Sequence, residues 1–133
     1  MKDKNQVLLI GFEPTTLDFS SFPNFNAEKV MEGLKKGQEK GLELGYDIEI
    51  CLIKPDGTDI DMISQKLSNS KFDCILIGAG IRVSPEYFLL FEKVVNIVHQ
   101  KASSSIICFN TNPNDSLEAI QRGFEFYIPK ENT

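Results

Sequence analysis

Arg82 is the charged residue whose sequence surroundings point most directly to a binding function. A serine and a proline follow it closely and are typical of the start of a helix. An anion bound beside Arg82 would therefore meet both a guanidinium group and the positive end of a helix. The alternative is a structural ion pair between Arg82 and Glu13 or Asp18, which would hold neighbouring loops in place.

Polar residues in three segments are candidates for the same site, because each segment follows a predicted strand. In open parallel sheets, ligands bind at the carboxyl ends of the strands, where the strand order reverses. We expect that reversal between the first and third strands, so the loops after them would meet there. The predicted ligand-binding residues are Glu13, Thr15, Thr16, Arg82, Ser84, Asn110 and Thr111. The expected ligand is small and anionic.

Catalytic and metal-binding constellations are not predicted. Cys51, Cys74 and Cys108 lie in separate apolar segments without a CxxC motif, which favours buried, reduced thiols. His99, the only histidine, lies about 21 Å along a helix from the ligand-binding edge at ~1.5 Å per residue. One histidine and scattered cysteines do not build a metal site. Without a visible pair of nucleophile and base we assign no reaction, and the question of enzymatic activity stays open.

Nucleotide cofactors are not expected either. Gly78-Ala-Gly80 resembles the beginning of a dinucleotide-binding motif, but Val83 stands where a third glycine is required, and the segment follows the third strand. The sequence contains no P-loop. Thr15 and Thr16 lack the run of hydroxyl residues and the glycine that an FMN phosphate loop would need. We therefore expect no cofactor.

Helical segments separate five apolar, strand-like segments, and this alternation indicates an α/β fold with a parallel sheet. The predicted strands are 7–12, 47–54, 72–77, 105–109 and 124–128, and the predicted helices are 27–44, 59–69, 85–102 and 113–122. We expect one domain over residues 1–133. Its fold would be a three-layer, doubly wound, five-stranded parallel sheet of flavodoxin-like or Rossmann-like type, with strand order 2-1-3-4-5. The order 3-2-1-4-5 is the alternative.

Particular residues are predicted to define the helix ends. Thr58, with Asp61 three residues later, is typical of a capping box. Ser84 and Asn112 are expected to cap the two later helices, and Gly123 is expected to end the last one.

Glycines recur at every fourth position of the helix predicted over 27–44. Gly33, Gly37 and Gly41 would form one ridge, with Gly45 just past the helix end. Because each glycine inside a helix costs about 1 kcal/mol relative to alanine, the ridge indicates close packing. We favour packing on the helix's own sheet, and packing on a partner helix is the alternative.

Three features predict a homodimer. The chain supplies no helix after the predicted fifth strand, so one face of the sheet would lack cover. Helix 85–102 is apolar around about half its circumference, and Leu89 lies apart from that apolar arc. The segment 12–25 is too apolar for a solvated loop, so it either folds over the bare face or joins an interface. Its large apolar residues are Phe12, Leu17, Phe19, Phe22 and Phe25.

Composition narrows the classes of partner. The net charge is −5, and lysines and arginines are spread along the chain, which argues against nucleic-acid binding. All apolar runs are much shorter than the ~18 residues of a membrane span, so we expect no membrane association. The apolar run that begins at Val7 is too short for a signal peptide. We therefore expect a cytoplasmic protein.

Four segments together resemble a family of small uncharacterised bacterial α/β proteins. The segments are Val7–Pro14 (VLLIGFEP), Phe72–Arg82 (FDCILIGAGIR), Leu90–His99 (LFEKVVNIVH) and Cys108–Asp115 (CFNTNPND). The resemblance covers nearly the whole chain and implies a compact α/β domain with a flavodoxin-like shape, but no catalytic residue. Within it, Glu92, Asn96 and His99 share one line of a helix, which favours a partner surface there.

Overall fold

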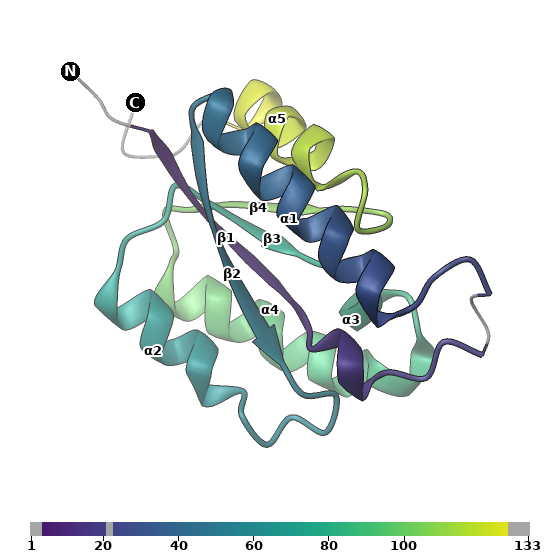
Figure 1. Cartoon of the computed structure of the whole chain (residues 1–133). Helices are drawn as coiled ribbons and strands as arrows, with labels where there is room; N and C mark the ends of the chain where they lie inside the picture. The colour runs from purple at the N-terminus through teal and green to yellow at the C-terminus, as the bar shows by residue number, and fades with distance from the viewer. Residues whose placement is uncertain (1–3, 21–22, 128–133) are drawn as a thin grey trace.

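A computed structural model describes residues 4–20 and 23–127 of the chain. Within these residues, four parallel strands form one sheet in the order β2-β1-β3-β4 (Figure 1). The strands are β1 (Asn5–Phe12), β2 (Tyr46–Ile53), β3 (Cys74–Ile77) and β4 (Ile106–Phe109). The order agrees with the first four positions of 2-1-3-4-5, and the alternative, 3-2-1-4-5, is wrong. A sheet of this order is compatible with a Rossmann-like or flavodoxin-like fold.

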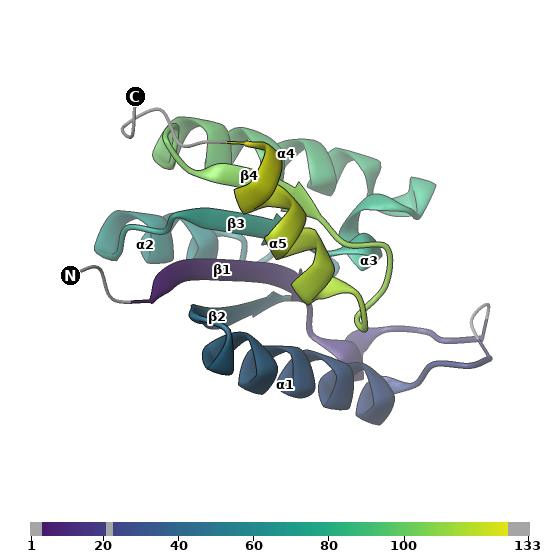
Figure 2. The same ribbon diagram turned by 90° about the horizontal axis from the view of Figure 1, so that it is seen from above.

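Helices cover both faces of the sheet, so the described chain has three layers (Figures 1 and 2). One face carries α1 (Ala27–Glu43) and α5 (Ser116–Phe126), and the other carries α2 (Asp61–Asn69) and α4 (Phe88–Lys101). The connections after β1 and β3 contain a short helix, α3 (Ala79–Arg82), and two 3-10 turns, η1 (Pro14–Thr16) and η2 (Pro85–Tyr87).

The central strands are apolar over Val7–Phe12 of β1 and throughout β3, as expected where both faces of a sheet are buried. Successive side chains of a strand point to opposite faces, so β1 contributes to two separate core clusters. The cluster under α2 and α4 includes Leu8, Ile10, Ile63, Val94 and Val98. The cluster under α1 and α5 includes Val7, Leu9, Leu34, Ala119 and Ile120.

The predicted fifth strand, 124–128, is wrong. Residues up to Phe126 belong to α5, and residue 128 lies outside the described residues. The apolar side chains follow a helical period, because Ile120 is fully buried and Phe124, four residues on, places its ring 5.5 Å from that of Tyr46. A short apolar run of this kind fits a buried strand or a helix face, and here the helix forms.

Gly123 lies inside α5 and does not end it, contrary to the prediction. A Cβ atom at this position would lie 3.1 Å from Ile106 and 3.6 Å from Cys108. The glycine therefore lets α5 approach β4 closely. Gly123 therefore serves helix–sheet packing inside α5, and the helix continues to Phe126.

The face of the sheet expected to lack cover is in fact covered. After β4 the chain passes directly to the face that carries α1, and α5 packs there beside α1 (Figure 2). The first of the three reasons for a homodimer is therefore wrong. The same helix that replaces the fifth strand supplies the missing layer.

The apolar segment 12–25 lies partly against the protein's own core. Phe12 is buried and Leu17 packs on the cluster under α2 and α4. Phe19 and Phe25 are half-buried, and Phe22 lies outside the described residues. The interface role predicted for this segment stays a prediction.

The three predicted side-chain caps, at Thr58, Ser84 and Asn112, are wrong. The Thr58 hydroxyl donates to Asp56 Oδ1 at 2.8 Å, and α2 begins further along the chain without a side-chain cap. Asn112 lies in the turn after β4, where its side chain accepts from the backbone N–H of Asn114 at 2.7 Å. Ser84 precedes the 3-10 turn η2 and not the predicted helix, since α4 begins only at Phe88, and its side chain makes no capping bond.

Two of the three glycines inside α1, Gly33 and Gly41, face other parts of the protein, whereas Gly37 faces open space. A Cβ atom at Gly41 would lie 2.6 Å from the side chain of Ile48 in β2, and one at Gly33 would lie 2.6 Å from Asn114. Gly45 has a φ of +96° just past the helix, the left-handed geometry expected at that position. The Gly41 contact agrees with packing of α1 on its own sheet, the favoured interpretation, whereas Gly33 lies against the loop that precedes α5.

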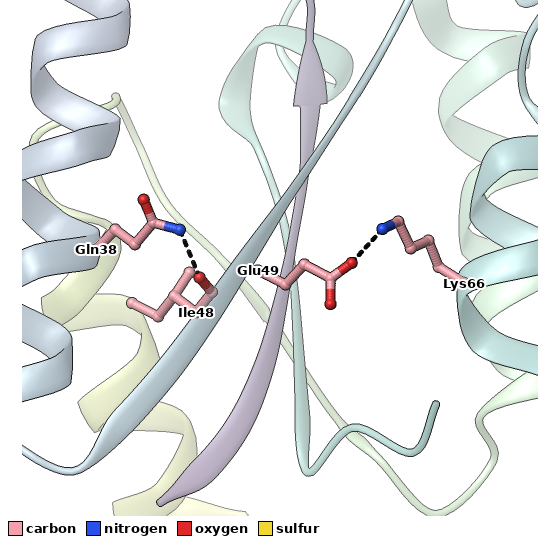
Figure 3. A network of polar contacts seen from close by, with 4 residues as sticks. All are labelled: Gln38, Ile48, Glu49 and Lys66. Atoms are coloured by element: carbon pink, nitrogen blue, oxygen red, sulfur yellow. Dashed lines mark hydrogen bonds and ion pairs between the residues drawn. The ribbon is translucent and has the colours of Figure 1, made fainter. Parts of the chain in front are cut away.

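Side chains from both helical layers hold β2, one edge of the sheet (Figure 3). From α1, Gln38 donates its side-chain amide to the Ile48 carbonyl at 2.7 Å. From α2, Lys66 pairs with Glu49, and its hydrogen bond to that carboxylate raises the lysine pKa. The edge strand is therefore fixed from both sides.

Candidate functional site

The loop after β1 is closed by its own hydrogen bonds. Glu13 accepts from the backbone N–H of Thr15 at 3.2 Å and from its hydroxyl at 3.0 Å. The Thr16 hydroxyl donates to the Glu13 carbonyl at 2.6 Å. These three predicted site residues therefore form the cap of η1, and no hydrogen bond within the described chain links them to Arg82.

The side chain of Asn110 links the loop that follows β3 to the segment that follows β4. It is only 3% exposed, and its side-chain oxygen accepts from the backbone N–H of Ala79 at 2.7 Å. Its amide nitrogen donates to the hydroxyl of Ser116, which is also buried, at 2.9 Å. The first N–H of α3 therefore already has a partner inside the protein.

Arg82 lies against the end of β4. Its Nη2 donates to the Asn110 carbonyl at 2.7 Å, and its guanidinium carbon lies 5.7 Å from the centre of the Phe109 ring. Its Nε is buried and has no hydrogen-bond partner. Within the described residues, Arg82 makes no ion pair with Glu13 or Asp18, so the structural alternative considered for this residue does not occur.

Thr111 belongs to a turn that Asp115 organises. Asp115 accepts from the backbone N–H of Thr111 at 2.9 Å and from its hydroxyl, and also from the backbone N–H of Asn112 at 3.2 Å. Partial burial acts to raise the pKa of Asp115, but these hydrogen bonds outweigh it and lower the pKa. The carboxylate stays ionised and fixes the turn before α5.

Of the seven predicted site residues, the structure brings Arg82 and Asn110 into contact. Glu13, Thr15 and Thr16 bond among themselves, Thr111 bonds to Asp115, and Ser84 makes no cap. Sequence reasoning missed Phe109 and Ser116, which hold the contacting pair in place. Phe109 directly precedes the segment 110–111 at the end of β4, so its position next to a strand end was the available signal. Ser116 is the first residue of α5, and no sequence pattern marked it.

A second feature lies at the opposite, amino-terminal edge of the sheet. A hollow of about 390 Å³ opens between the chain segments that follow α2 and α4. Its lining comprises residues 67–72 and 101–105 and is rich in serine. No sequence prediction named these residues, although the serine-rich turn 103–105 is visible in the sequence.

The three cysteines are buried and free, as predicted. Cys74 and Cys108 place their sulfur atoms 3.4 Å apart under α5, and the hydrogen bond between them, together with burial, strongly raises the pKa of Cys74. Burial also raises the pKa of Cys51, which lies in the cluster under α2 and α4. Cys51 and Cys74 are therefore poor nucleophiles.

His99 lies exposed in the last turn of α4, at the end of the helix away from Arg82. In the described part of the chain, no three cysteine, histidine or carboxylate side chains gather as a metal site would require. None of the described helices has the length and apolar character needed to cross a membrane.

Comparison with models of known protein families finds no match, and comparison with curated protein sequences finds no significant similarity.

Proposed function

We propose that this protein binds a small anionic ligand at the carboxyl edge of its sheet, through Arg82. The observation that carries the proposal is the buried Nε of Arg82, which lacks a hydrogen-bond partner. A buried donor without a partner costs about 1–3 kcal/mol. A hydrogen bond to an anion would remove that cost once the neighbouring side chains open a path to this nitrogen, which is closed to solvent in the structure. The ligand class is a carboxylate or a phosphate.

The position of the guanidinium group supports this proposal. One of its nitrogens is fixed to the Asn110 carbonyl and its plane lies near the Phe109 ring, so little freedom is left to lose on binding. Arginine presents several N–H groups in a planar fork that fits the paired oxygens of a carboxylate or phosphate. We assign no reaction to the site.

Arg122 offers a matched control for the binding test. Its Nη2 donates to the Phe109 carbonyl at 2.8 Å, one residue before the carbonyl that Arg82 uses. Arg122 is exposed, and its charge acts on Asp115. The two arginines therefore make similar bonds, but only Arg82 combines this bond with a buried, unpartnered nitrogen.

Inorganic phosphate, followed through backbone amide NMR signals, tests the proposal. Signals of residues 78–86 should shift and saturate, and Arg82→Gln should weaken binding at least about tenfold. Arg82→Lys, which keeps the charge but loses the fork, should weaken it less, and Arg122→Gln should change it by less than about twofold. Unmoved signals at millimolar phosphate, or equal losses in both glutamine variants, would contradict the site.

A second candidate function is a non-enzymatic interaction module that assembles as a homodimer. The observation in its favour is the exposure of Phe88 and Leu89, at 59% and 68%, at the start of α4. Exposed apolar side chains grouped in this way are typical of interaction surfaces. The two functions are compatible, since the Arg82 site lies beside this helix.

We further propose that the protein acts in the bacterial cytoplasm. The support is the resemblance to a bacterial family, together with three buried cysteines that carry no disulfide. Reduced cysteines are usual in cytosolic proteins. The net charge of −5 agrees with a ligand other than nucleic acid.

A further inference from the structure

We infer that the open edge of β4 and the adjoining side of α4 form a surface that binds a second copy of this chain about a two-fold axis. The inference rests on the homodimer described above as a second candidate function, and it names the surface through which that dimer forms. β4 is the edge strand opposite β2 (Figure 2). The free backbone groups of β4 and the side chains of α4 point to the same axis.

The outer side of β4 carries backbone groups without partners. The N–H of Ile106 donates to the Asp73 carbonyl beside β3, and successive residues of a parallel strand direct their backbone groups to alternate sides. Both backbone groups of Ile107 therefore point away from β3, as do the N–H of Phe109 and the C=O of Ser105. Within the described residues, none of these outward groups forms a hydrogen bond.

These free groups match each other across a two-fold axis at Ile107. Antiparallel pairing of two β4 strands there joins Ile107 to its own copy, and joins the Phe109 N–H to the Ser105 carbonyl of the partner copy. The pairing uses every free group once. It omits the bond from the Ser105 N–H to the Phe109 carbonyl, but Ala102 and Arg122 already occupy these two groups. Two-fold pairing therefore fits this edge without breaking any of its own hydrogen bonds.

One side of α4 carries a stripe of residues that faces the same edge. Val94 and Val98 are fully buried against the sheet, and a Cβ atom at Gly57, shortly before α2, would lie 3.3 Å from Leu90. At 3.6 residues per turn, the side of α4 opposite Leu90 therefore points away from α2, along the open edge of β4. The stripe on that side consists of Phe88, Glu92, Val95 and His99. Its first residue, Phe88, belongs to the exposed apolar group noted above.

The stripe and the strand share one centre. The ring centres of Phe91 and Phe109 lie 6.2 Å apart, so these two residues lie at one level along the sheet. α4 runs opposite to β4, because it returns the chain from the end of β3 to the start of a parallel strand. With about 3.3 Å per strand residue and about 1.5 Å per helical residue, the distance from Phe109 back to Ile107 equals that from Phe91 to Val95. An axis through Ile107 therefore passes near Val95.

Around this axis the α4 helices of the two copies lie antiparallel, and their side chains are complementary. Glu92 precedes Val95 by nearly the same distance as His99 follows it, so Glu92 of one copy faces His99 of the partner copy. Both residues are exposed, and the imidazole N–H is a donor for the carboxylate. Symmetry forms this contact twice. The surface is thus complementary to itself in backbone and in side chains, which favours a second copy over an unrelated partner.

Charge exchange on α4, followed by sedimentation equilibrium at micromolar concentration, tests the side-chain contact. His99→Glu places a second carboxylate against Glu92 of the partner copy and should weaken the dimer at least about tenfold. Adding Glu92→Lys restores opposite charges at both contacts and should return the dissociation constant to within about threefold of the wild-type value. Lys93→Glu is the matched control, because Lys93 is exposed on α4 outside the stripe, and should change it by less than about twofold.

Amide hydrogen exchange tests the strand pairing separately. The N–H groups of Ile107 and Phe109 should exchange at least about tenfold more slowly in the wild-type dimer than in the His99→Glu variant. A dimer with rapid exchange at both residues, or one that His99→Glu leaves intact or Glu92→Lys fails to restore, overturns this surface but not the homodimer. A wild-type protein that sediments as a single species of 15.0 kDa overturns both.

Discussion

At the scale of single residues, Asn110 has the largest expected effect on stability. Replacement by alanine leaves the buried N–H of Ala79 and the hydroxyl of Ser116 without their partners. We expect Asn110→Ala to lower the free energy of unfolding by about 3 kcal/mol, measured by urea denaturation.

Asn96 is the control for this experiment, because its side chain is exposed and bonds to the Glu92 carbonyl within its own helix. Asn96→Ala should change stability by less than about 0.7 kcal/mol, in the stabilising direction that helix propensity predicts. A similar loss in both variants would show that the Asn110 bonds do not hold the two connections together.

The buried thiols lead to a prediction about reactivity. Because thiolate is the reactive form, and the hydrogen bond to Cys108 and burial raise the pKa of Cys74, the folded protein should react slowly with a thiol reagent. In urea all three cysteines should react promptly. A colorimetric thiol assay with and without urea measures both rates, and prompt reaction of the native thiols would contradict the burial described above.

The raised pKa also fixes the direction of a pH effect on stability. The folded state retains the Cys74 proton, whereas in the unfolded state the thiol loses it above its ordinary value of 9.0. The contribution to stability is therefore complete below about pH 9 and is lost as the pH rises from there toward the folded-state pKa. Urea denaturation of the wild type should show a steeper loss of stability above pH 9 than Cys74→Ala.

At the scale of elements, substitutions of two glycines of α1 distinguish the effect of helix propensity on stability from the effect of packing. A Cβ atom at Gly37 would have no neighbour within 4 Å, whereas one at Gly41 would lie 2.6 Å from the Ile48 side chain. Gly37→Ala should therefore raise the free energy of unfolding by about 1 kcal/mol.

The Gly41→Ala variant should gain less stability than Gly37→Ala, or should lose stability, because the buried side chain of Ile48 must move to make room for the new Cβ atom. Thermal or urea denaturation of the two variants provides the comparison. Equal gains would mean that α1 adjusts its distance from β2 without cost.

The predictability of the fold differs between elements for a physical reason. Long apolar runs such as β1 and the alternation with helices predict the first four strands, their order and the helices between them. Residues 124–126 were predicted as a strand because a short apolar run does not distinguish strand from helix. The close approach of Gly123 to Ile106, which decides between them, is a tertiary contact absent from any local pattern.

The candidate site shows the same division. Arg82 and Asn110 each follow a strand in the sequence, and this position predicts that both lie at the carboxyl edge of the sheet. They do lie there, because the parallel topology determines which loops meet. The same sequence position does not predict that Glu13 accepts a hydrogen bond from Thr15 or that Asp115 accepts one from Thr111, since such bonds depend on the exact turn that each loop adopts.

At the scale of the whole molecule, exposure at the start of α4 carries the homodimer prediction. A stable interface removes about 800 Å² of surface from each partner, and Phe88 and Leu89 would lie in its core. Sedimentation equilibrium at micromolar concentration should give twice the chain mass of 15.0 kDa. Leu89→Glu should shift the protein toward the monomer.

Met62 provides the control for this measurement, because it is an exposed apolar residue on a different helix, α2. Met62→Glu should leave the mass unchanged. A wild-type protein that sediments as a single species of 15.0 kDa would exclude the homodimer at that concentration.

The central position of β1 in the sheet has a consequence for the folding rate of the chain. Val7 pairs with Ile48 on one side and with Cys74 on the other, and Cys74 in turn pairs with Ile106. Every strand pairing therefore closes a loop of tens of residues, and the described sheet contains no hairpin that forms locally. High contact order of this kind slows folding, because the entropy of loop closure is lost before the pairing compensates for it. The helices between the strands, which form from local contacts, shorten the effective loops and would guide each pairing.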